Sequence, residues 1–174
     1  MMKKKITLLA MVLTMVASLF AGCGKDSGSG SSKKQTDYEK AVGKFMDSMA
    51  DRDSDKMISL LLPEDVYQGL ADIYTATGTE YTSDDIKEMF ASIISLDDIP
   101  DDFAYTIGDS TKMSEDDIED LEGDLYFEDL ELEIDEAYEV EVTATYTQDD
   151  EKQKEEESVY AYKYDGSWYV FIDA

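Results

Sequence analysis

Residues 138–147 read YEVEVTATYT, and residues 159–172 read VYAYKYDGSWYVFI. In the first stretch, apolar side chains alternate with Glu and Thr, which is the period of a half-buried strand with a wet outer face. In the second stretch, Asp165-Gly166 is a two-residue hairpin signal, because both positions tolerate a positive φ. We therefore predict an antiparallel meander of strands at 138–147, 159–164 and 168–172, with the charged segment 148–157 as a hairpin connection.

Helical periodicity dominates the residues before this sheet. Thr36 and Glu39 have the spacing of a capping box, and apolar residues then recur at intervals of three and four up to Met49. The same spacing predicts a short helix from Ser54, a helix around 66–74 that stops near Gly78, and a helix capped by Thr82 or Ser83 that runs to Ile94.

The middle of the chain changes from helical to strand periodicity. Alternation predicts a strand at 103–107, and a brief helix follows from Ser114 to Leu121, with Gly123 as its stop. Residues 125–135 alternate like a strand but are heavily acidic, so strand and helix both stay open there. Helices followed by an antiparallel sheet indicate the α+β class, with N-terminal helices packed on a curved sheet.

The composition excludes several classes of function. The 174 residues include 42 acidic and 15 basic side chains, a net charge of −27, which excludes general nucleic-acid binding. The chain has no His, so it has no His-based triad, general base or metal ligand. A single Cys excludes an intramolecular disulfide and any Cys-rich metal site. We expect no cofactor.

The first residues read as a targeting segment. Lys3, Lys4 and Lys5 precede an uncharged, mostly apolar run from Ile6 to Ala21. The run is short for a membrane span, which needs about 20 residues, and it fits the apolar region of a secretory signal peptide. Residues 24–37, GKDSGSGSSKKQTD, are typical of a flexible tether. One acidic domain, 38–174, follows; its 40 acidic and 9 basic side chains give a net charge of −31.

The end of the apolar run, Leu19-Phe20-Ala21-Gly22-Cys23, resembles the lipobox of bacterial lipoproteins. Phe20 stands where that family usually has Leu. The resemblance implies that Cys23 receives a diacylglycerol, that cleavage of the Gly22–Cys23 bond removes the signal peptide 1–22, and that residues 23–37 become a lipidated tether. The chain would then be anchored on the extracytoplasmic face of the cell membrane. The alternative is an uncleaved anchor helix with an incidental Cys.

The order of predicted elements, together with the closing stretch DGSWYV at 165–170, resembles the nuclear transport factor 2-like (cystatin-like) superfamily. It is most similar to the small extracytoplasmic members attached to lipoprotein signals, which mostly have no assigned function. The resemblance implies a cone in which a curved sheet wraps a long helix, often around a pocket. A homodimer is a further expectation, because edge strands of this fold often pair.

Catalytic and metal-binding patterns are weak. Some relatives of this fold are enzymes with a pocket Asp base and a Tyr partner, but no lone acid here lies within an apolar stripe, so we predict no catalytic residue. Asp51, Asp53 and Asp55 begin like a calcium loop, but Lys56 and Leu62 stand where that loop needs Gly and Glu. The acidic segment 97–102 is a second calcium candidate.

A third acidic run, Glu115 to Asp117, is typical of a helix start. The row Tyr160, Tyr162 and Tyr164 is either core or a binding platform, and we favour core, as we do for Trp168. We therefore predict a non-enzymatic module that binds a hydrophobic small ligand or an envelope protein. The alternatives are a small pocket enzyme with an Asp/Tyr acid–base pair and a weak calcium-binding envelope protein.

Overall fold

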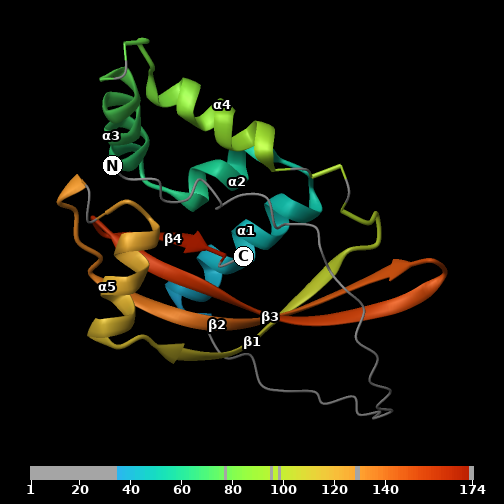
Figure 1. Ribbon diagram of the computed structural model, residues 1–174. Helices are drawn as coiled ribbons and strands as arrows, with labels where there is room; N and C mark the ends of the chain where they lie inside the picture. Colours follow the sequence, from blue (N-terminus) through green and yellow to red (C-terminus); the bar gives the residue numbers. More distant parts are fainter. Residues whose placement is uncertain (1–34, 77, 95, 98, 128–129, 173–174) are drawn as a thin grey trace.

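The computed structural model describes residues 35–76, 78–94, 96–97, 99–127 and 130–172 (Figure 1). The elements follow in the order α1 (Asp37–Ala50), α2 (Ser54–Leu61), α3 (Glu64–Thr75), α4 (Ser83–Ile93), β1 (Ala104–Lys112), α5 (Glu115–Asp124), β2 (Glu136–Gln148), β3 (Glu151–Tyr164) and β4 (Ser167–Phe171). Four helices therefore precede the strands of an antiparallel sheet, and α5 lies between β1 and β2 along the chain. This order confirms the α+β class.

The four strands form one open sheet in the order β1-β2-β3-β4 (Figure 1). Every neighbouring pair is antiparallel. The predicted turn at Asp165-Gly166 joins β3 to β4, and both residues have a positive φ, of 46° and 74°. The meander and its closing turn are thus confirmed.

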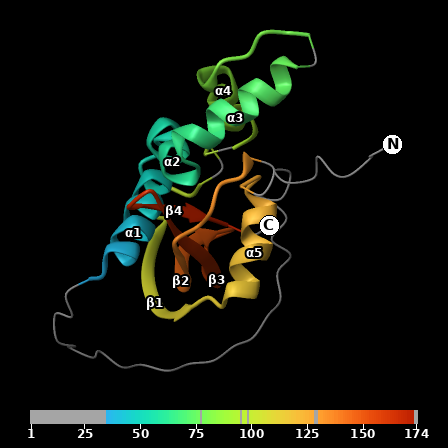
Figure 2. The ribbon, with the colours of Figure 1, turned by 90° about the vertical axis from the view of Figure 1, so that its left-hand side faces the viewer.

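Different helices pack against the two faces of the sheet. One face carries Val140, Val159 and Val170, which cluster with Val42 and Phe45 of α1. The other face carries Ala137, Tyr162 and Phe171, which cluster with Leu121, Leu125 and Phe127 in and after α5. Figure 2 shows the sheet between α1 and α5. The predicted wet outer face is therefore present at the exposed Glu139 and Glu141 but not at the start of β2.

Capping boxes start three of the helices. Thr36, Thr82 and Ser114 each accept a backbone hydrogen bond three residues on, and an acidic side chain at that position bonds back to the cap in every case. The capping box at Thr36 is thus confirmed, and Thr82 rather than Ser83 caps α4. The helix start at Ser114 is also as predicted, but α5 continues through Gly123 to Asp124, because a glycine inside a helix costs only about 1 kcal/mol.

The prediction of a long connection at 148–157 was wrong. β2 runs to Gln148 and β3 begins at Glu151, so the turn is only Asp149-Asp150, with φ of 52° and 66°. Figure 1 shows this hairpin extending beyond the rest of the sheet. Charged side chains do not prevent a backbone ladder, and Asp accepts the left-handed conformation that a tight hairpin turn requires.

Residues 125–135 form neither a strand nor a regular helix where they are described. The backbone N–H of Leu132 donates to the carbonyl of Phe127 at 2.9 Å, and the N–H of Ile134 donates to the carboxylate of Glu122 at 2.6 Å. The described part of the segment forms no strand, and its apolar side chains enter the core, where Phe127 contacts Tyr162 and Tyr164 of β3. Phe127 is fully buried there.

The N-terminal predictions cannot be followed in the structure. The signal peptide 1–22, Cys23 and the tether as far as residue 34 lie outside the described residues. Among the helices that the structure describes, none combines the length and the apolar character of a membrane span.

Candidate ligand-binding site

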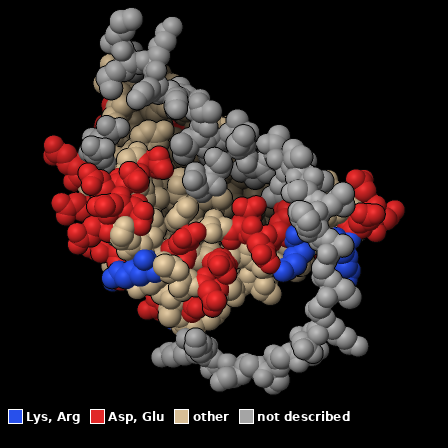
Figure 3. Space-filling model, turned by 60° about the horizontal axis from the view of Figure 1, so that its bottom comes forward, with Lys and Arg blue, Asp and Glu red and all other residues tan. Residues whose placement is uncertain are grey.

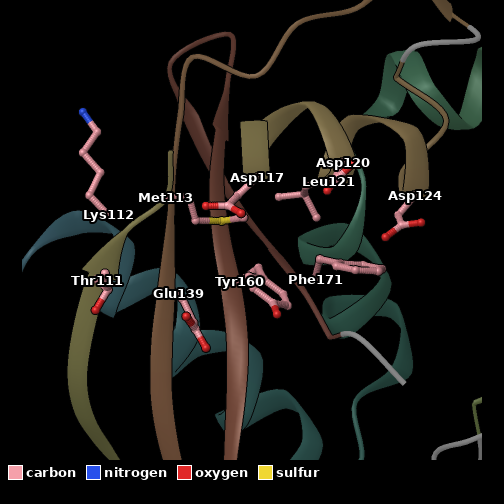
Figure 4. Close-up of a pocket in the computed structure, with 10 residues that line it drawn as sticks. All are labelled: Thr111, Lys112, Met113, Asp117, Asp120, Leu121, Asp124, Glu139, Tyr160 and Phe171. Atoms are coloured by element: carbon pink, nitrogen blue, oxygen red, sulfur yellow. The ribbon is translucent and has the colours of Figure 1, made fainter. Parts of the chain in front are cut away.

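A hollow of about 380 Å³, which we call the α5 hollow, lies between α5 and the sheet (Figure 4). Its volume is in the range of small-molecule sites. Four of its lining residues are acidic: Asp117, Asp120, Asp124 and Glu139. Four others are apolar or aromatic: Met113, Leu121, Tyr160 and Phe171. The lining of the hollow therefore combines apolar side chains with four negatively charged carboxylates.

Helical spacing and strand register explain this arrangement. Asp117, Asp120 and Asp124 are three and seven residues apart, so α5 presents them on one side. Glu139 of β2 pairs with Tyr160 of β3, which in turn pairs with Phe171 of β4. These three residues form one cross-strand row, so their side chains share the face of the sheet that looks toward α5.

The carboxylates in the hollow have different partners. Ser114 hydrogen-bonds to Asp117 through its side chain and its backbone, and these bonds hold the pKa of Asp117 below its usual range. Asp120 and Glu139 have no hydrogen-bond or ion-pair partner among the described residues. Lys112 is at the rim, but its side chain points away in Figure 4. The field inside the hollow is therefore negative.

The outer side of α5 borders a second acidic hollow of about 620 Å³. Ile118, Leu132 and Ile134 form its apolar part, and six carboxylates surround them: Glu115, Glu119, Glu122, Glu131, Glu133 and Asp135. Glu122 is already engaged with the backbone N–H of Ile134. Figure 3 shows that Asp and Glu cover much of the face in view, with Lys and Arg at only a few places.

The two calcium candidates do not assemble a site from their described residues, and Asp98 lies outside those. Asp53 caps α2 by accepting from the N–H of Lys56 at 3.0 Å. Asp101 pairs with Arg52 at 2.6 Å, and Asp102 accepts from the backbone and the hydroxyl of Thr147. In the part of the chain that is described, no three acidic or Cys side chains converge where a metal ion would fit. The acidic run at Glu115 begins α5, as predicted.

Pairs of a carboxylate and a tyrosine do occur, away from the α5 hollow. Tyr105 donates to Asp47 at 2.6 Å, but Asp47 is exposed. Tyr146 donates to Oε1 of Glu155 at 2.8 Å, and the buried Oε2 has no partner in the described structure. Burial and this carboxylate raise the pKa of Tyr146 to about 12. Neither pair lines either of the two hollows.

The tyrosine row of β3 divides between core and hollow. Tyr162 is fully buried, and its hydroxyl donates to the carbonyl of Leu61 at 2.6 Å. Tyr164 donates to Asp65 at 3.3 Å, whereas Tyr160 lines the hollow. Trp168, predicted as core, is half-buried beside Tyr38, with ring centroids 5.6 Å apart. Two sequence features contribute to the hollow: the acidic residues of α5 and the tyrosine row of β3. The sequence analysis interprets the first as a helix start and the second as core, so it does not predict the hollow.

Comparison with known proteins adds no name to this site. The chain matches no known family model, curated protein or solved structure.

Proposed function

We propose that this chain is a lipoprotein of the extracytoplasmic membrane face, and that its acidic domain is a non-enzymatic module that binds a cationic ligand. The observation that carries the ligand class is the α5 hollow. Four carboxylates line it, and the one Lys at its rim points away (Figure 4). A site of this charge attracts cations and repels anions.

The ligand that fits best is an organic amine or guanidinium compound with a short apolar part. Its charged groups would lie near Asp120 and Glu139, which have no partner among the described residues. Its carbon chain would contact Leu121 and Phe171, and the ring of Tyr160 offers a cation–π surface. An anionic lipid or a polyanion would meet repulsion at the same place.

The membrane part of the proposal rests on the sequence. The basic start, the apolar run and the lipobox at Gly22-Cys23 occur in the order that lipoproteins use. A diacylglycerol on Cys23 is sufficient as an anchor, because each buried CH₂ contributes about 0.8 kcal/mol and two chains hold where one is marginal. The acidic domain would stand off anionic headgroups at the end of its tether.

The fold supports a distant relation to the nuclear transport factor 2-like superfamily. Helices precede a strand, a short helix and a three-stranded meander, which is the element order of the resemblance. The sheet here is open, and α5 covers one of its faces (Figure 2). We propose the relation at the level of architecture, with the α5 hollow as this chain's own binding site.

Isothermal titration of the full chain with spermine tests the ligand class. We expect binding that the double variant Asp120→Asn/Glu139→Gln weakens at least tenfold. The matched control, Glu151→Gln/Glu157→Gln, removes the same charge from the β2–β3 hairpin and should change the affinity less than twofold. Equal weakening in both variants would show that spermine only screens the net charge of −31 on residues 38–174, and the proposed site would be wrong.

A further inference from the structure

The large apolar side chains that are exposed gather on one pair of helices. Among the described residues, the exposed large hydrophobics are Ile73 and Tyr74 of α3 and Met89 and Ile93 of α4, with exposed fractions of 47%, 37%, 38% and 48%. Single exposed apolar residues scattered over a surface are normal, but these four all lie on two helices that pack against each other. We call these four residues the α3–α4 surface.

These residues continue the buried stripes of their own helices. Ile73 lies seven residues after the fully buried Val66 and three after the buried Leu70. Ile93 lies seven residues after the buried Ile86 and four after Met89. Such spacings place side chains on the same helix face. The apolar face of each helix therefore extends beyond the part that the described fold covers.

The two helices form a unit that can present this surface. They pack against each other through Tyr67 and Phe90, whose rings meet edge to face at 5.7 Å, and through the ion pair of Lys87 with Glu64 at 2.6 Å. Figures 1 and 2 show the pair at one end of the molecule, away from β1 and β2. Because α3 and α4 stabilise each other, the pair can keep its shape when its four exposed apolar side chains have no partner.

The charge around this surface selects the occupant. The sequences of α3 and α4 contain six acids and a single base, Lys87, which is already paired with Glu64. A second copy of this chain would bring the same negative charge to the contact. A partner that offers apolar side chains flanked by Lys or Arg would satisfy both features of the surface.

We propose that the α3–α4 surface is a docking site for a basic amphipathic helix of another protein. Apolar side chains of that helix cover Ile73, Met89 and Ile93, and its Lys and Arg side chains face the acids of α3 and α4. This site shares no residue with the hollow beneath α5. It is independent of the ligand assigned there, and the chain can engage a partner and a small cation at once.

The test uses the full chain in phosphatidylcholine nanodiscs, with empty discs as the blank. The probe is a synthetic 18-residue helix with a Leu face and a Lys face that carries a photoreactive group, and a Leu/Glu version serves as the charge control. We expect crosslinks within residues 64–93, no binding of the Leu/Glu peptide, and at least tenfold weaker binding to Ile73→Ser/Ile93→Ser.

A control apolar change, Ile118→Ser, lies within α5, outside the α3–α4 surface, and should leave the affinity within twofold. Both Ser positions of the double variant are about half exposed, so its thermal unfolding should match that of the unchanged chain. Crosslinks on α5, or equal binding by the double variant, would refute the docking site. Dimers that the double variant abolishes in sedimentation would do so too, because the occupant would then be a second copy.

Discussion

Tyrosine hydroxyls connect the sheet to the helices at several places. Tyr105 of β1 donates to the carbonyl of Gly43 in α1, at 2.9 Å, as well as to Asp47. Tyr162 and Tyr164 of β3 reach the end of α2 and the start of α3. A tyrosine suits this position because its ring fills the interior while its hydroxyl satisfies a polar group. The last carbonyls of a helix have no partner within the helix, so Leu61 needs such a donor.

Tyr162→Phe should destabilise the domain more than its small change in volume suggests. The change removes the only donor that is described for the Leu61 carbonyl, and a buried acceptor without a partner costs about 1–3 kcal/mol. Urea unfolding of the variant should show a lower midpoint. Tyr81→Phe is the control, because the Tyr81 hydroxyl has no partner among the described residues, and its stability should stay within about 0.5 kcal/mol. Equal losses in both variants would show that the hydrogen bond to Leu61 contributes nothing.

At the scale of elements, the part of the β2–β3 hairpin near its turn is held by its backbone ladder more than by apolar packing. Pairing runs without interruption from Glu136↔Lys163 to Gln148↔Glu151. Toward the turn, most side chains on both strands are exposed. Its stability there depends on the turn and on cross-strand pairs such as Thr145 with Lys154.

Replacing Asp149-Asp150 by Asn-Gly should therefore stabilise the hairpin. Both positions have a positive φ, which Asn and Gly adopt with less strain, and the change removes two adjacent negative charges. We expect the free energy of unfolding to rise by about 0.5–1 kcal/mol. Asp165→Asn, in a turn that already ends in Gly166, should change it by less than about 0.5 kcal/mol. A lower thermal midpoint for the Asn-Gly variant would contradict this view of the turn.

At the scale of the whole molecule, the acidic domain depends on tyrosines that stay neutral. Burial raises the pKa of Tyr67 and of Tyr162 well above the usual value of 10. The carboxylate of Glu64 adds to the effect at Tyr67, and the neighbouring Tyr67 and Tyr169 add to it at Tyr162. The pKa of Tyr146 is raised to about 12, chiefly by burial. In each case the folded state holds the phenol proton more tightly than the unfolded chain does.

The protein should consequently unfold in alkali. Folded pKa values above the unfolded value mean that the contribution to stability is complete below pH of about 10 and is lost as pH rises beyond it. We expect phenolate absorbance at 295 nm and loss of circular dichroism to rise together, near pH 12 for Tyr146. Ionisation of all twelve tyrosines near pH 10 in a chain that stays folded would contradict this.

Cys23→Ala tests the anchor separately from the binding sites. The variant should take up no radiolabelled fatty acid in the cells that produce it, and its signal peptide should stay attached, which a gel would show as a larger protein. Spermine binding should not change, because the lining of the α5 hollow comes from residues 111–171. Unchanged lipid labelling of the variant would rule out the lipoprotein assignment and leave the ligand proposal untouched.

Much of the fold followed from short-range patterns. The capping box at Thr36, the helix start at Ser114 and the turn at Asp165-Gly166 all depend on residues within three positions of each other, so the sequence alone was sufficient to predict them. The prediction of a connection at 148–157 failed because this segment contains only charged and polar side chains, and such a segment gives no hydrophobic signal for a strand. Where they are described, residues 125–135 form no strand although their apolar residues alternate, because these side chains enter a core shared with α5 and β3, where Phe127 contacts Tyr162 and Tyr164.

By itself, the sequence determined the α+β class, the positions of most helices and strands, and the exclusion of His chemistry and of an intramolecular disulfide. The tertiary structure alone decided that Asp120, Glu139 and Tyr160 surround one hollow, and that Ile73 and Ile93 stay exposed. The physical reason is range. Periodicity and capping act between neighbours, whereas a shared hollow requires the register of three strands and the packing of a helix that lies up to about fifty residues away along the chain.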